Sequence, residues 1–86
     1  MPNFSMEYSE ESLSQLKNFD KIAIKRIIKK IESTKGNPQK FFKKLTGRPE
    51  YKLRVGDYRI IAQIELDKRA IFIRSIGHRK NVYNNL

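Results

Sequence analysis

The sequence predicts an α+β fold in which helices pack on one antiparallel sheet, and three observations support that class. A short alternating segment comes first, and a helical hydrophobic spacing follows it. The second half of the chain is dominated by β-rich runs, two of which are separated by Gly56-Asp57. With 86 residues, the chain has apolar material for one small core, so we expect a single domain over residues 1–86.

The N-terminal segment predicts a strand and then a short helix. A strand with one buried face is predicted over residues 3–8 by the alternation of Phe4, Met6 and Tyr8. Ser9 suits the N-cap of the helix, because its side-chain oxygen accepts a hydrogen bond from a free backbone N–H. Glu10 and Glu11 follow it, where carboxylates favour the positive end of the helix dipole.

A second, amphipathic helix is predicted from Lys21 to Thr34, with Asp20 as its cap. Its apolar stripe has the i, i+3, i+4, i+7 spacing and consists of Ile24, Ile27, Ile28 and Ile31. Residues 18–20 join the two helices, which therefore form an antiparallel hairpin. Gly36, Asn37 and Pro38 predict the stop, because Gly tolerates a left-handed C-terminal conformation and Pro cannot continue the helix.

Residues 39–49 predict a connector with one helical turn, in which Phe41, Phe42 and Leu45 are core or interface residues; a base-stacking surface is the alternative for these side chains. Three strands follow and form an antiparallel meander on the helices. Their expected ranges are Tyr51 to Val55, Tyr58 to Glu65 and Ala70 to Ile76.

The composition narrows the classes of function. Nineteen Lys and Arg against nine Asp and Glu give a formal charge of +10, which is typical of a protein that meets a polyanion or an acidic protein. The absence of cysteine excludes disulfides and thiolate chemistry and favours a reducing, cytoplasmic location. We expect no membrane segment, since no apolar run approaches the roughly 18 residues of a span. We also expect no metal and no cofactor, because His78 is the only histidine and has no ligand partners at metal spacing.

The predicted hairpin at Gly56-Asp57 sorts its side chains by face. Its register places Arg54 opposite Arg59, with Lys52 on the same face and an apolar set on the other: Leu53, Val55, Tyr58 and Ile60. Like charges at opposed positions are unfavourable, and no acidic residue is interleaved, so a phosphate backbone is a candidate counter-charge. The alternative is a solvated strand face.

The last strand leads into a polar cluster. Arg74 is expected to alternate with Phe72 and Ile76, and residues 77–83 read Gly-His-Arg-Lys-Asn-Val-Tyr. Metal-free cleavage of RNA needs a group that assists the 2′-hydroxyl, cations for the charged transition state and a proton donor for the 5′-oxygen. Lys, Arg, His and Tyr between them have these capacities.

At this point the sequence resembles the RelE/ParE toxin superfamily. The resemblance covers nearly the whole chain, and its most specific blocks are Leu-Arg-Val-Gly-Asp-Tyr-Arg at 53–59 and Gly-His-Arg-Lys-Asn-Val-Tyr at 77–83, with Lys-Leu-Thr-Gly at 44–47 in addition. It implies a RelE-like fold and a RelE-type enzyme that cleaves messenger RNA in the ribosomal decoding site (the A site), with an antitoxin that inactivates it. The implied partners are therefore a cognate antitoxin, mRNA and ribosomal RNA.

The resemblance also implies the site. Lys52 and Arg54 match the basic pair of the first hairpin strand, and Arg59, Arg79 and Tyr83 match the remaining functional positions. It implies that Tyr83 activates the 2′-hydroxyl, that Arg59 binds the phosphate, and that Arg79 stabilises charge or donates a proton. The residues expected to contact RNA around this site are Lys43, Lys44, Arg48, Arg74 and Lys80.

Some alternatives stay open from the sequence. His78 is either a proton carrier or a histidine that ends the strand. The lysines of the second helix form either a solvated face or a contact with ribosomal RNA. A ParE-like toxin, which shares the fold but inhibits DNA gyrase, and a non-catalytic RNA-binding module are the alternative functions.

Overall fold

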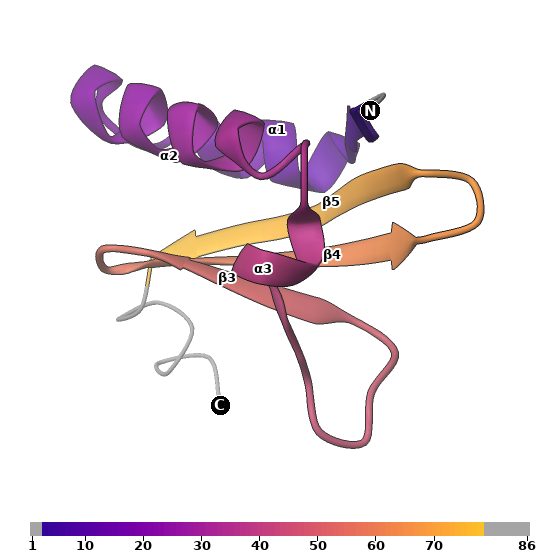
Figure 1. The fold of residues 1–86 in the computed structure, drawn as a ribbon. Helices are drawn as coiled ribbons and strands as arrows, with labels where there is room; N and C mark the ends of the chain where they lie inside the picture. Colours follow the sequence, from indigo (N-terminus) through magenta and orange to yellow (C-terminus); the bar gives the residue numbers. More distant parts are fainter. Residues whose placement is uncertain (1–2, 79–86) are drawn as a thin grey trace.

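The computed structural model describes residues 3–78, and it confirms the predicted α+β class. Helices α1 and α2 cover one face of a twisted sheet (Figure 1). The longest helix has 13 residues, and no helix of the described part is long and apolar enough to cross a membrane. In chain order the elements are β1 (Ser5–Tyr8), α1 (Glu10–Leu16), α2 (Lys21–Ser33), α3 (Pro38–Phe41), β2 (Lys43–Lys44), β3 (Tyr51–Val55), β4 (Tyr58–Glu65) and β5 (Ala70–His78).

The sheet has the strand order β1-β5-β4-β3-β2. The predicted meander forms its centre, while β1 joins the far side of β5 in parallel. β2 is a strand that the sequence did not predict: two lysines in the connector pair antiparallel with Tyr51 and Lys52 at the outer edge of β3. The single helical turn expected in the same connector is present as α3.

Both predicted helix caps are present. The Ser9 hydroxyl accepts a hydrogen bond from the Ser12 N–H at 3.0 Å, and the Asp20 carboxylate accepts one from the Ala23 N–H at 2.7 Å. Helix α2 ends differently from the prediction, because Gly36 does not adopt a left-handed conformation. Thr34 instead caps the helix in a right-handed conformation, and its buried hydroxyl donates to the Ile31 carbonyl at 2.7 Å.

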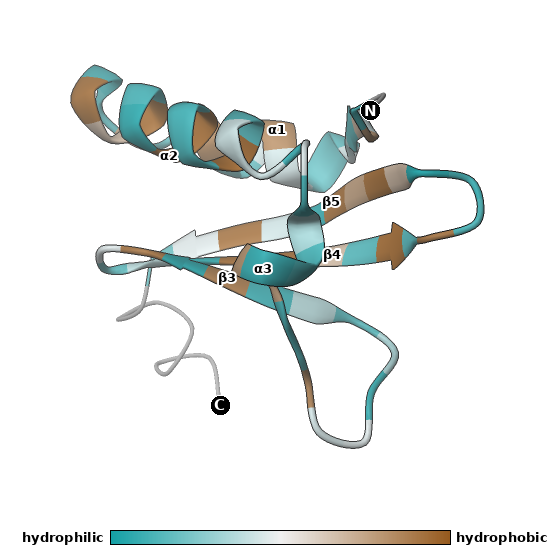
Figure 2. Ribbon diagram, viewed as in Figure 1, coloured by the Kyte–Doolittle hydropathy of each residue, from teal (hydrophilic) through white to brown (hydrophobic). Residues whose placement is uncertain are grey.

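The core lies between α2 and the sheet, as the isoleucine stripe predicts. Ile27 and Ile31 are completely buried, whereas Ile24 and Ile28 pack partly buried at its margin. Apolar residues recur along α2 and along the central strands (Figure 2). The sheet contributes the predicted hairpin face to this core: Leu53, Val55 and Ile60 are buried and Tyr58 packs against them.

A bulge between Ile61 and Ala62 changes the alternation along β5. Ile73 lies on one side of the bulge and Ile76 on the other. Both face the core and are buried, although they are three residues apart. The expected simple alternation of Arg74 with Phe72 and Ile76 is therefore wrong, because the extra residue of a bulge shifts the faces of a strand. Arg74 lies at this shift and is exposed.

Helix α1 covers the open edge of β5 where β1 ends. The Ser9 hydroxyl donates to the Arg74 carbonyl at 2.7 Å, and the Gln15 side-chain oxygen accepts from the Ile76 N–H at 2.6 Å. These bonds satisfy backbone groups that would otherwise be free at a sheet edge.

The first prediction concerns Gly56, whose φ of +60° turns the β3–β4 hairpin. A Cβ at this position would lie 3.1–3.2 Å from the Arg26 guanidinium. We expect Gly56→Ala to lower the free energy of unfolding by about 1–2 kcal/mol, because a left-handed conformation is unfavourable for alanine. Urea unfolding measures this change. Gly36→Ala is the matched control, since a Cβ there would make only an ordinary contact with the Asn3 side chain at 3.8 Å and Gly36 has no positive φ; equal losses in both variants would contradict the prediction.

The second prediction concerns Tyr8, whose pKa is raised to about 12 by burial and, secondarily, by the Glu32 carboxylate. Folding favours the neutral phenol, so this contribution to stability is complete below pH 10 and disappears as the pH rises through 12. We expect wild-type protein to lose stability relative to Tyr8→Phe between these values. Urea unfolding of both proteins from pH 8 to 12 checks it, and a constant difference would refute it.

Candidate phosphodiester site

The hairpin register predicted from the sequence is confirmed. Arg54 pairs with Arg59, and Lys52 pairs with Ile61 on the next strand. These cations belong to the outer face of the sheet, which is the face turned away from α1 and α2. Arg59 lies opposite Gly77 of β5, and Lys52 lies opposite Lys43 of β2. The sheet thus gathers four cations from three adjacent strands.

Most members of this cationic cluster form no ion pair with a carboxylate of the described residues. One basic side chain near the cluster, Arg48, forms an ion pair with Glu50 at 3.1 Å. Neither Lys52 nor Arg54 takes part in one. Opposed like charges destabilise a sheet, so the cluster is suited to an external anion.

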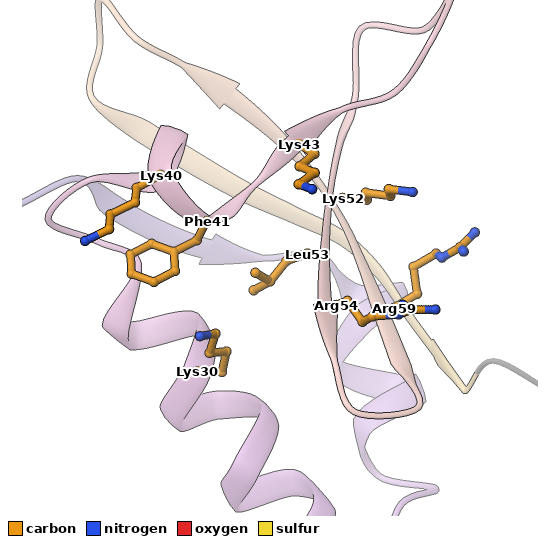
Figure 3. A pocket seen from close by; sticks show the side chains of 8 residues that line it. All are labelled: Lys30, Lys40, Phe41, Lys43, Lys52, Leu53, Arg54 and Arg59. Carbon is orange, nitrogen blue, oxygen red and sulfur yellow. The ribbon is translucent and has the colours of Figure 1, made fainter.

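A first cavity, of about 400 Å³, bends around β3 next to this cluster (Figure 3). Leu53 points toward Phe41 and Lys30, whereas Lys52 and Arg59 point to the other side of the hairpin. The eight lining residues are Lys30, Lys40, Phe41, Lys43, Lys52, Leu53, Arg54 and Arg59. Six of these eight side chains are cationic, and two of the six, Lys30 and Lys40, come from the helical side.

A second cavity, of about 350 Å³, lies on the other side of Arg59. The small residues Ser75 and Gly77 line it together with Ile61, so β5 leaves room beside the arginine. The connector before β3 contributes Leu45, Thr46 and Arg48, and Gln15 of α1 completes the lining. Arg59 therefore borders both cavities and is central to the outer face.

The remaining predicted contact residues are less closely grouped. Lys44 is exposed on β2, opposite Tyr51, and Arg48 borders the second cavity. Arg74 is exposed and lines neither cavity. Arg79, Lys80 and Tyr83 lie outside the described residues.

His78 lies on the helix-facing side of the sheet. It pairs with Tyr58, and the two ring centroids are 5.1 Å apart in an edge-on arrangement. Tyr58 in turn lies 4.9 Å from Phe19. Because side chains on opposite faces are separated by the sheet itself, His78 extends away from Arg54 and Arg59.

Sequence reasoning did not find Lys30, Lys40 and Phe41 as lining residues. The Lys30 ammonium lies 4.9 Å and the Lys40 ammonium 5.8 Å from the centre of the Phe41 ring. The adjacent aromatics were a usable signal: Phe42 is buried, and its neighbour Phe41 is only partly buried and lines the first cavity. A cation over an aromatic face is held without a carboxylate and keeps N–H groups for another acceptor.

The arrangement is suited to a phosphodiester. Guanidinium groups match phosphate oxygens in pairs, and a lysine ammonium adds a compact point charge. Within residues 3–78, no three Asp, Glu or His side chains come together as metal ligands would. The described residues thus provide phosphate binding and charge stabilisation.

The third prediction follows from the opposed arginines. We expect Arg54→Gln to raise the free energy of unfolding by about 0.2–1 kcal/mol at low ionic strength, because it removes a like-charge pair, and the gain to shrink as salt screens it. Thermal unfolding at two salt concentrations measures both effects. Arg48→Gln removes the same charge but breaks the pair with Glu50, so a similar gain in that control would contradict the explanation.

Comparisons with known proteins identify the family. Residues 6–83 match the family model described as "ParE toxin of type II toxin-antitoxin system, parDE". The chain is 34% identical over 87 residues to a protein of Methanocaldococcus jannaschii named "Putative toxin RelE1", and the match covers 95% of this chain and 97% of that protein.

The fold is shared with solved toxin structures. The toxin–antitoxin complex RelBE2 of Mycobacterium tuberculosis gives a TM-score of 0.83 at 16% identity, covering 92% of this chain and 94% of that chain. The isolated RelE toxin of E. coli gives a TM-score of 0.75 at 24% identity, covering 95% and 93%. With the match over residues 6–83, these likenesses show that the chain belongs to the RelE/ParE family of toxins of type II toxin–antitoxin systems.

Proposed function

We propose that this toxin is a ribosome-dependent endoribonuclease that cleaves mRNA in the A site and so inhibits translation. The observation that carries the proposal is the cluster of Lys52, Arg54 and Arg59 on the outer face, with a cavity on each side of Arg59. A bound RNA strand neutralises this cluster and places a phosphodiester beside Arg59.

The proposed reaction needs no metal. The 2′-oxygen attacks the adjacent phosphorus and loses its proton to a base, a 2′,3′-cyclic phosphate forms, and the P–O5′ bond breaks as the 5′-oxygen takes up a proton. Arg59 and Arg54 stabilise the extra negative charge of the phosphorane, and Lys52 adds a further positive charge. From the sequence resemblance, we assign activation of the 2′-hydroxyl to Tyr83 and charge stabilisation or proton donation to Arg79.

This assignment gives no step to His78, since its ring packs against Tyr58 on the opposite face. Lys43, Lys44 and Arg48 border the cluster and the second cavity, and we propose that they contact RNA beside the cleaved bond, with Arg74 and Lys80 as further contacts. The substrate and the ribosome place the proposed activity in the cytoplasm.

We further propose that a cognate antitoxin inactivates the protein. The Pyrococcus horikoshii structure that resembles this chain, with a TM-score of 0.77, is a RelE–RelB complex. An acidic antitoxin segment complements the formal charge of +10 carried by this chain.

A second candidate function is inhibition of DNA gyrase, as in ParE-like toxins. The observation that favours it is the name of the matching family model, which describes a ParE toxin. The cluster on the outer face favours the nuclease, because it provides the charge stabilisation that phosphodiester cleavage requires.

The fourth prediction tests the nuclease. We expect wild-type protein to arrest translation and to cut mRNA, and Arg59→Gln to slow cutting about 10²–10³-fold, because it removes a cation at the reacting phosphate. Arg79→Ala and Tyr83→Phe are expected to abolish arrest. Primer extension on mRNA, with purified ribosomes present, measures the cutting.

Lys25→Gln is the matched control, since it removes one positive charge from the outer side of α2 and is expected to leave cutting unchanged. Omitting ribosomes should reduce cutting strongly, because the ribosome helps to position the substrate. Arrest that survives all three site variants, or that follows DNA damage without mRNA cuts, would reject the nuclease and favour the gyrase inhibitor. RNA binding without cutting would indicate a non-catalytic module.

A further inference from the structure

A third cavity, of about 450 Å³, lies between α2 and the hairpin on the helix side of β3. It shares Lys30 and Arg54 with the first cavity, so the two are adjoining parts of one groove. We call this the α2–β3 groove; its cations along the helical side are Arg26, Lys29, Lys30 and Lys40, and Arg54 stands on the strand side.

The groove holds two of its cations by unusual contacts. The guanidinium of Arg26 lies over the hairpin turn, so close to Gly56 that a Cβ there would be 3.1 Å from one of its nitrogens. Lys30 lies over the Phe41 ring, which it shares with Lys40. Glycine and phenylalanine thus position these charges without neutralising them, and their N–H groups remain donors for an anion.

None of the residues that line the groove is acidic. Within residues 3–78, no carboxylate forms an ion pair with Arg26, Lys29 or Lys30. So many neighbouring cations repel one another, and a ligand that carries several negative charges in a row relieves this repulsion. The groove also leads directly to the outer-face cluster at Lys52 and Arg54.

We propose that the α2–β3 groove binds the backbone phosphates of a single RNA strand as it continues beyond the cleaved bond. The inference rests on the proposed function, because it extends the path of the same substrate. The strand leaves Arg59, passes the edge of β3 at Arg54 and follows α2 through Lys30 to Arg26.

An acidic protein segment fits a different surface better. Such a segment usually binds through apolar side chains as well as charge. The exposed apolar cavity of α2 lies elsewhere, where Ile22, Ile24 and Ile28 are flanked by Lys21 and Lys25. The α2–β3 groove offers mainly cations, which suits phosphates that are read without base contacts.

The test compares two double variants of the full chain that lose equal charge from the same helix. Arg26→Gln/Lys30→Gln changes the groove, and Lys21→Gln/Lys25→Gln changes the apolar side. The probe is a single-stranded RNA of about 12 nucleotides, 2′-O-methylated so that it cannot be cleaved, and its Kd is measured over a range of salt concentrations.

We expect the groove variant to bind at least about tenfold more weakly at 0.1 M salt and to lower the salt slope by about 1.4, or about 0.7 for each lost contact. The control is expected to stay within about threefold of wild type, since it changes only the long-range field. Arg26→Lys/Lys30→Arg should restore most of the affinity, and thermal unfolding should show that all variants are folded.

Three results would overturn the inference. Equal weakening in both double variants would show that net charge, and not the groove, determines binding. Unchanged RNA affinity in the groove variant, with weaker binding of an acidic peptide, would assign the groove to a protein. Wild-type protein that does not bind the probe would also contradict it. Because the probe cannot be cut, each result is separate from the cleavage test at Arg59.

Discussion

The left-handed turn at Gly56 sets the pairing of β3 with β4, and most of the arrangement described above depends on that register. A shift by one residue would turn Leu53 and Ile60 out of the core and bring Arg54 and Arg59 under the helices. The burial of apolar side chains against Ile27 and Ile31 therefore also holds the arginines together on the outer face. Stability and site geometry depend on the same few backbone hydrogen bonds.

The sheet separates two kinds of chemistry. Its helix-facing side contains Tyr58 and His78 in an aromatic group. Its outer side contains charged side chains, and next to them β5 has only the small residues Ser75 and Gly77. Small residues next to Arg59 leave space where larger ones would fill the second cavity. The position of a side chain along a strand thus decides whether it belongs to the core or to the site, even between neighbours such as Gly77 and His78.

Features with local causes were predictable from the sequence. The two helix caps, the isoleucine stripe and the Gly56 hairpin each follow from residues close together in the chain, and the cluster of Lys52, Arg54 and Arg59 followed from the hairpin. Features that depend on distant pairing were not predictable. The bulge at Ile61 and the strand at Lys43–Lys44 arise from the fit between strands, and the approach of Lys30 to Phe41 requires the whole connector to fold back.

The short length of β2 has a consequence for self-association. β2 pairs only with Tyr51 and Lys52, so among the described strands none covers the outer edge of β3 from Leu53 to Val55. An open edge is a template on which a second copy can add a strand and begin to aggregate. Here the edge is bordered by Arg54, Lys30 and Arg26, and a second copy would bring the same charges against them. The cations beside the strand therefore protect the free toxin from edge-to-edge aggregation.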